Sequence, residues 1–186
     1  PNFSQNGYIY LLYVVDRHHL LYYGTPSYSP TADLYYDATI GRLTRYTARA
    51  SDHFKSVDPA SRLVLIGQSK ESGFPILHQS HGVGGLAFGT DGTLLAACGD
   101  AASYIEVDSG GQVGGGYRDQ AIADGILKPK EDVGAFRSQL VDCLNGKILR
   151  IDPSTGAGIP SNPFYDPANP LAPRSRVWAL GLRNPY

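Results

Sequence analysis

Two histidines near the middle of the chain could act in proton transfer. His78 stands in a His-Gln-Ser string, and His81 opens a glycine-rich stretch, His-Gly-Val-Gly-Gly. Because the ordinary pKa of histidine is closest to neutral pH, either imidazole could take a proton from a substrate hydroxyl group as a general base. A histidine at the start of a strand is also often a hydrogen-bonded bystander, so residue type alone does not choose between the two.

Three further side chains could support such a base or a bound anion. Asp100 follows an apolar run and a glycine, where a carboxylate can orient an imidazole ring or merely cap a turn. Arg183 carries a planar, permanently charged guanidinium, which suits negative charge that develops on an oxygen atom. Asn184 carries an amide that can donate and accept hydrogen bonds, but an Asn-Pro pair is also a common turn former.

The composition restricts how these residues can be positioned. The 186 residues include 22 Gly, 13 Pro and 13 Tyr, which favours short strands and turns over long helices. The formal charge of −1 comes without a basic stripe, so nucleic-acid binding is disfavoured. The apolar runs are far shorter than the roughly 20 residues that a membrane span needs. Cys98 and Cys143 lack the spacing of a zinc or haem site, which leaves two buried thiols or one disulfide as alternatives.

Three segments recur in the same order along the chain, which indicates a repeated unit. The pairs are 6–13 with 91–98, 41–46 with 146–151, and 61–67 with 175–181. In the first pair an Asn-Gly or Asp-Gly turn leads into an apolar strand. In the second pair apolar and cationic residues alternate, as in a strand with one face in water. Residues 85–89 supply one more short strand across the turn at 90–92, so the unit has four strands.

Four-stranded antiparallel units repeated around an axis describe a β-propeller. The expected fold is therefore all-β, a fragment of about two blades built from four-stranded antiparallel meanders. We expect residues 1–186 to form a single partial domain. Within it, 1–67 would be an incomplete blade without its innermost strand, 84–180 a complete blade with a long connection at 101–140, and 181–186 the start of the next blade. A sandwich of about nine strands is the alternative.

The stretch 81–92 (HGVGGLAFGTDG), followed by Cys98-Gly99-Asp100, closely resembles the signature of the PQQ-dependent glucose/sorbosone dehydrogenases, the soluble aldose sugar dehydrogenases. Three flanking segments resemble the same family in the same order, at 1–10, 144–152 and 178–185. The resemblance implies a six-bladed propeller with PQQ and calcium at one end of its axial channel, of which this chain would supply about two blades. It also implies a periplasmic or secreted protein.

Position by position, the resemblance implies that His81 is the catalytic base and that Asp100 is the carboxylate beside it. Arg183 would take part in catalysis and would contact both the quinone and the substrate oxygens, and Asn184 would be a further cofactor contact. His78 is three residues away from the base position and does not match. The base and the arginine must then lie close together in the fold, at a central tunnel.

Two positions depart from the family pattern. Gly85 stands where the soluble glucose dehydrogenases have an arginine, and Ser80 stands where an acidic residue precedes the base. The segment after Asp100 does not align, so the family's substrate-contacting glutamines cannot be assigned; Gln120 is one option. Substrate preference is therefore open.

The function implied by the resemblance is oxidation of an aldose sugar at its anomeric carbon. A histidine base would take the hydroxyl proton while hydride passes to PQQ, and the electrons would continue to an acceptor such as a cytochrome or a quinone. The calcium ligands would lie beyond Tyr186, so this segment alone should be inactive. One alternative is a non-catalytic ligand-binding propeller of the same superfamily. Another is metal-dependent lactone hydrolysis, for which the sequence shows no cluster of ligands.

Overall fold

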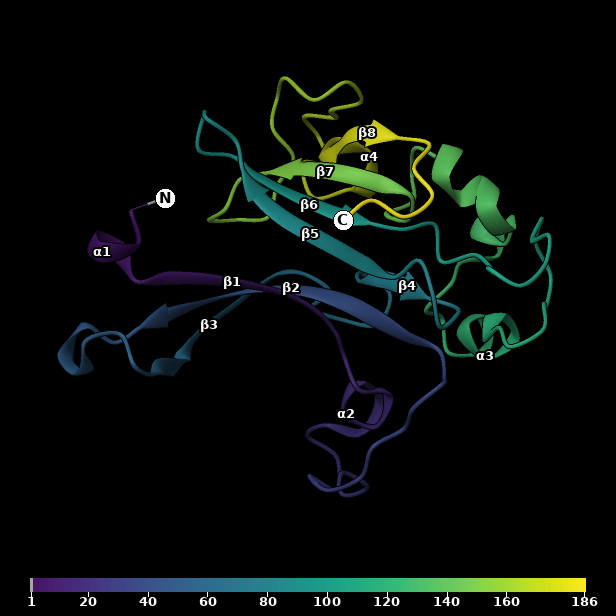
Figure 1. Ribbon diagram of the computed structural model, residues 1–186, viewed down its shortest axis with the longest axis horizontal. Helices are drawn as coiled ribbons and strands as arrows, with labels where there is room; N and C mark the ends of the chain where they lie inside the picture. Colours follow the sequence, from purple (N-terminus) through teal and green to yellow (C-terminus); the bar gives the residue numbers. More distant parts are fainter. Residues whose placement is uncertain (1) are drawn as a thin grey trace.

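The computed structural model describes residues 2–186, so Pro1, the first residue of the motif at 1–10, lies outside the described part. Within it, eight strands form two four-stranded antiparallel sheets (Figure 1). The first sheet contains β1 (Tyr8–Val14), β2 (Thr39–Ala48), β3 (Val57–Ile66) and β4 (Phe74–Ile76). The second contains β5 (Val83–Phe88), β6 (Leu94–Cys98), β7 (Lys147–Ile151) and β8 (Val177–Leu180). The all-β prediction is confirmed.

The strand order matches the repeats seen in the sequence. The first sheet runs β1-β2-β3 and the second runs β5-β6-β7-β8, so the repeated segments occupy equivalent places, β1 with β6, β2 with β7 and β3 with β8. β5 pairs with β6 across the predicted turn, with Phe88 opposite Leu94. Sequential neighbours pair throughout these runs, which is a meander and not the crossed order of a Greek-key sandwich. Within the described residues β1 pairs with β2 alone, which leaves its other edge without a strand.

A short strand, β4, was not anticipated from the sequence. It extends the first sheet beyond residue 67, and its Phe74 pairs with Gly41 at the beginning of β2. The ring of Phe74 is completely buried. A side chain at Gly73 would collide with Ile40, so glycine permits the close approach of the two backbones. Tertiary burial therefore makes a strand of a segment that is too short to show a periodic pattern.

The helical segments are short. They are α1 (Phe3–Asn6), α2 (Arg17–Tyr22), α3 (Arg118–Ala123) and α4 (Pro173–Arg176), with 3₁₀ turns at Ala50–Asp52, Pro129–Glu131 and Gly134–Gln139. The long connection between β6 and β7 thus has its own secondary structure, α3 and two of these turns. None of the helices in residues 2–186 combines the length and the apolar character needed to cross a membrane.

Two apolar clusters position the loops. The larger cluster fills the space between the sheets, with Leu43 and Phe74 from the first sheet packed with Leu94 and Leu149 from the second. A second cluster joins the two long connections to the ends of the strands; it contains Val15, Ala38, Ile40, Leu77, Ala101, Ala121, Ile126 and Leu127. Figure 1 shows the connections that carry α2 and α3 at one end of the sheets, away from the N-terminus. Each buried Leu or Ile contributes on the order of 2 kcal/mol.

The structure corrects one expectation about the cationic residues and decides between the two alternatives for the cysteines. The cationic positions of β2 and β7 were expected to face water, but Arg42 is 6% exposed and Lys147 is fully buried. The reason is that backbone carbonyl groups surround the Lys147 ammonium group, which donates to three of them. Cys98 and Cys143 are free, buried thiols, and burial raises the pKa of both.

Candidate active site

His81 lies in the connection between β4 and β5, held in a constrained backbone conformation. Its φ of 54° is in the left-handed region, which residues other than glycine rarely adopt. Its carbonyl oxygen accepts a hydrogen bond from the N–H of Ala101 at 3.0 Å. A side chain at Gly99 would collide with the backbone of His81, so glycine is required there. The pairing of β5 with β6 thereby extends to the histidine and fixes it beside the end of β6.

The surroundings of the imidazole define its tautomer. Nδ1 of His81 lies 3.0 Å from the carbonyl oxygen of Ala102 and 3.4 Å from Oδ1 of Asp100. Both oxygens are acceptors, so Nδ1 carries the hydrogen and Nε2 of the neutral ring keeps its lone pair. No hydrogen bond joins Nε2 to any of residues 2–186. The ring is thus prepared to accept a proton at Nε2.

Asp100 is buried between the histidine and an arginine. Its side chain is 2% exposed, and its Oδ1 also accepts the N–H of Ala102 at 3.0 Å. Its Oδ2 accepts from Nη1 of Arg183 at 2.9 Å, across 83 positions of sequence. The second guanidinium nitrogen, Nη2, donates to the carbonyl of Ser103 at 2.7 Å. The structure therefore brings His81, Asp100 and Arg183 together in one network.

The end of the chain runs beside β5. A side chain at Gly84 would collide with the carbonyl group of Pro185, whereas at Gly85 it would meet Tyr186 at an ordinary 3.5 Å. The ladder between β5 and β6 is irregular between Val83 and Leu86, so the bulge and its glycines make room for this approach. Asn184 is exposed, and its side chain makes no hydrogen bond within the described chain.

Arg137, a buried arginine that was not predicted from the sequence, holds the backbone of the network in place. Nε of Arg137 donates to the carbonyl of Asp100 at 2.9 Å, and Nη2 donates to that of Ala101 at 3.1 Å. The Asp108 carboxylate lies 3.8 Å from this guanidinium. Burial lowers the pKa of Arg137 against the opposing effect of Asp108. The only sequence signal was a charged residue in a glycine-rich connection, which does not distinguish a buried charge from a solvated one.

The other candidates from the sequence have different roles. The Gln120 amide accepts from the N–H of Ala38 at 2.6 Å and donates to Asp37 at 3.0 Å, so it joins the two long connections and is not part of the network. His78 is buried, with Nε2 3.3 Å from the carbonyl of Gly114. A cavity of about 550 Å³ is lined by His78 and its neighbour Gln79, among others.

The side chains of His81 and Arg183 fit one of the two groups that the motif resemblance implies, PQQ and calcium, better than the other. The Arg183 side chain is half-exposed and shares the Asp100 carboxylate with Nδ1 of His81. The guanidinium suits an anionic quinone such as PQQ, and the Nε2 acceptor suits the proton of a substrate hydroxyl group. For calcium the result differs, because residues 2–186 contain no group of three or more His, Cys, Asp or Glu side chains arranged to hold a metal ion.

Solved structures share the fold of this chain over nearly its whole length. The PQQ-bound form of an aldose sugar dehydrogenase from Streptomyces coelicolor aligns with 99% of this chain at 19% identity and a TM-score of 0.52. Two glucose dehydrogenase structures align over the same share at 19% identity, with TM-scores of 0.53 and 0.52. No family model and no curated protein matches the sequence.

The chain spans about a third of the structures that it matches, 34% of the first and 36% of the other two. This share agrees with the prediction of about two blades out of six. Similarity at this level of identity establishes the fold. This chain is therefore an all-β portion, two antiparallel sheets, of the propeller fold of these sugar dehydrogenases.

Proposed function

We propose that the protein carrying this chain oxidises an aldose sugar at its anomeric carbon, with PQQ as cofactor and His81 as general base. The observation that carries the proposal is the network of His81, Asp100 and Arg183, in which the base has an open Nε2 and a fixed tautomer. The solved dehydrogenases that share the fold support it, one of them bound to PQQ.

Each residue of the network would have its own role in the reaction. Nε2 of His81 takes the proton of the anomeric hydroxyl group, and the imidazolium that results is stabilised by the Asp100 carboxylate 3.4 Å from Nδ1. Arg183 stays fixed by Asp100 and Ser103 and places positive charge next to the substrate and cofactor oxygens. Asn184 is a further contact for the cofactor. PQQ, when bound, would supply the quinone that accepts hydride.

The proposal includes partners outside this chain segment. Calcium would be held by ligands from elsewhere in the protein, and an acceptor such as a cytochrome or a quinone would remove the electrons. The protein would act in the periplasm or outside the cell. These parts depend on the resemblance of the motifs at 81–92, 98–100 and 178–185.

The test uses the intact protein, first titrated with PQQ and then supplied with calcium, an artificial electron acceptor and a panel of aldoses. We expect saturable PQQ binding and acceptor reduction with at least one aldose. PQQ binding without any aldose oxidation would contradict the reaction. Absence of PQQ binding would contradict the cofactor as well and would favour the non-catalytic binding module.

A further inference from the structure

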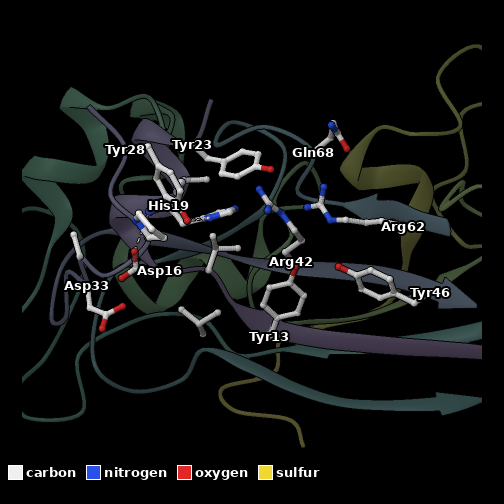
Figure 2. Close-up of a pocket in the computed structure, with 15 residues that line it drawn as sticks. Tyr13, Asp16, His19, Tyr23, Tyr28, Asp33, Arg42, Tyr46, Arg62 and Gln68 are labelled. Carbon is white, nitrogen blue, oxygen red and sulfur yellow. Dashed lines mark hydrogen bonds between the residues drawn. The ribbon is translucent and has the colours of Figure 1, made fainter. Parts of the chain in front are cut away.

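The arginines of this chain differ in whether their contacts are complete within residues 2–186. Figure 2 shows Arg42 and Arg62 lining a cavity on the face of the first sheet that is turned away from the second. A propeller places the neighbouring blade on that face, so the final contacts of these two side chains depend on residues outside this chain. Arg137 is 2% exposed, and each of its three guanidinium nitrogens donates to a carbonyl group within residues 100–131. The rest of the propeller therefore does not alter its contacts.

Arg137 holds two successive carbonyl groups just after β6. Its Nε donates to the carbonyl of Asp100 at 2.9 Å, and its Nη2 donates to that of Ala101 at 3.1 Å. The planar guanidinium fixes the direction of both carbonyl groups at once. Ala101 has a φ of 55°, in the left-handed region that residues other than glycine seldom adopt. Such a conformation persists only where the surrounding contacts hold it, and Arg137 supplies two of them.

The carboxylate of Asp108 holds the same stretch of backbone, residues 100–103. It lies 3.8 Å from Nη2 of Arg137, and its side chain is 7% exposed. Its Oδ2 accepts the N–H of Ser103 at 3.1 Å, and its Oδ1 accepts that of Gly110 at 3.2 Å. The buried ion pair therefore fixes one side of this stretch through both of its members.

The remaining polar groups of this stretch contact the two functional side chains. The Asp100 carboxylate and the Ala102 carbonyl lie next to Nδ1 of His81, at 3.4 Å and 3.0 Å. The same carboxylate and the carbonyl of Ser103 accept from Arg183, at 2.9 Å and 2.7 Å. All these acceptors, which orient His81 and Arg183, belong to the stretch that the buried ion pair fixes.

We propose that Arg137 is a positioning residue, which acts through the backbone of residues 100–103 to keep His81 in the tautomer with its hydrogen on Nδ1. Without the two guanidinium hydrogen bonds, Ala101 would be free to leave its left-handed conformation, and the Ala102 carbonyl would move away from Nδ1. A neutral imidazole without that acceptor populates both tautomers, so some rings would carry the hydrogen on Nε2 and could not accept a proton there. The effect on catalysis rests on the proposed function, whereas the tautomer is a property of the fold alone.

The test compares the intact protein with Arg137→Met by nitrogen-15 NMR of the histidine rings, with the His81 signal identified by its loss in His81→Ala. We expect the Nδ1–H tautomer alone in the wild type and a mixture with Nε2–H in Arg137→Met. Arg176→Met is the matched control, because Arg176 is also buried and donates to two backbone carbonyls, those of Gly156 and Leu65. This variant should destabilise the protein and leave the tautomer of His81 unchanged.

Activity gives a second measurement. Arg137→Met should lower kcat for aldose oxidation on the order of tenfold or more and change KM much less, because the base is misplaced while the substrate contacts remain. Wild-type kcat in this variant would contradict the catalytic consequence. If the wild type oxidises no aldose, the proposed function fails, and the tautomer measurement still decides whether Arg137 positions His81.

The Nδ1–H tautomer alone in folded Arg137→Met would overturn the proposal. So would an equal mixture in Arg176→Met, because the effect would then be one of stability alone. Arg137→Lys decides the matter if Arg137→Met does not fold. It keeps a positive charge beside Asp108 but loses the planar fork, so the Nε2–H tautomer should appear to a smaller extent. A wild-type spectrum of this variant would then overturn the proposal.

Discussion

Asp100 and Arg183 are joined twice, once through side chains and once through backbones. The Arg183 guanidinium donates to the Asp100 carboxylate at 2.9 Å, and the Asp100 N–H donates to the Arg183 carbonyl oxygen at 2.9 Å. The same carboxylate faces the imidazole of His81. A change at any one of these residues should therefore alter the positions of the other two, and their effects on activity should not add.

Replacing the base tests the proposed reaction most directly. His81→Ala should lower kcat for aldose oxidation by about 10²-fold to 10⁴-fold, because a positioned general base contributes that much. The measurement is acceptor reduction by the intact protein loaded with PQQ and calcium. His53→Ala is the matched control, since His53 is exposed and has a similar φ of 60°. Wild-type activity in His81→Ala would exclude this residue as the base.

Asp100→Asn should reduce both stability and activity. The amide cannot accept from Arg183 and orient His81 as the carboxylate does, so we expect the free energy of unfolding to fall by about 2 kcal/mol. We expect kcat to fall about tenfold or more, because the ring loses its support. Asp132→Asn is the control, because this carboxylate also pairs with an arginine, Arg118, outside the network. If both variants lost activity equally, the effect would be one of stability alone.

Gly84→Ala should displace the segment that carries Arg183. The new methyl group would collide with the carbonyl of Pro185, which corresponds to overpacking that costs about 1–3 kcal/mol. Thermal unfolding of the intact protein should show a lower Tm. At Gly85→Ala the nearest atom is 3.5 Å away, so this neighbouring substitution should have little effect. Equal melting temperatures for the two variants would show that the end of the chain does not lie against β5.

Lys147 should make stability depend on alkaline pH. Burial lowers the pKa of this ammonium group from 10.5 to about 8 in the folded protein. Between these values the unfolded chain binds more protons than the folded one, so the contribution of Lys147 to the free energy of unfolding rises with pH from about 8 to 10.5. The advantage of the wild type over Lys147→Met, measured by denaturant unfolding, should increase across this range on the order of 2 kcal/mol.

The control for this pH effect is Lys128→Met, at an amine whose side chain is 48% exposed. The difference between the wild type and this variant should change less over the same range than the difference for Lys147→Met. Equal pH dependence for the two variants would mean that burial does not lower the pKa of Lys147.

The strands were predictable because their signals are local. The Asp-Gly turn before β6 and the alternation in β2 and β7 depend on adjacent residues, and the repeat placed these segments in the same order twice. β4 was not predictable, because it forms only where Phe74 is buried against β2. The positions of Arg137 and Lys147 could not be predicted either, since their partners are backbone carbonyls brought near by folding.

The proximity of His81, Asp100 and Arg183 could be expected only through the resemblance of motifs to a family. Nothing in the spacing of these three residues alone requires them to meet. The burial of Arg42 was missed, because the alternation at 41–46 indicated a strand with one face in water. Which residues of β2 and β3 lie opposite one another depends on the register of the two strands, which includes bulges that sequence patterns do not reveal.

The edge of β1 that faces away from β2 has no partner strand in the described residues. Tyr8, Leu11 and Val14 on this strand are 37%, 45% and 48% exposed, next to backbone groups without strand partners in the described chain. Such an edge can recruit a strand from another molecule by continuing the ladder of hydrogen bonds. The 186-residue polypeptide produced by itself should therefore self-associate edge to edge, and its apparent mass in solution should increase with concentration.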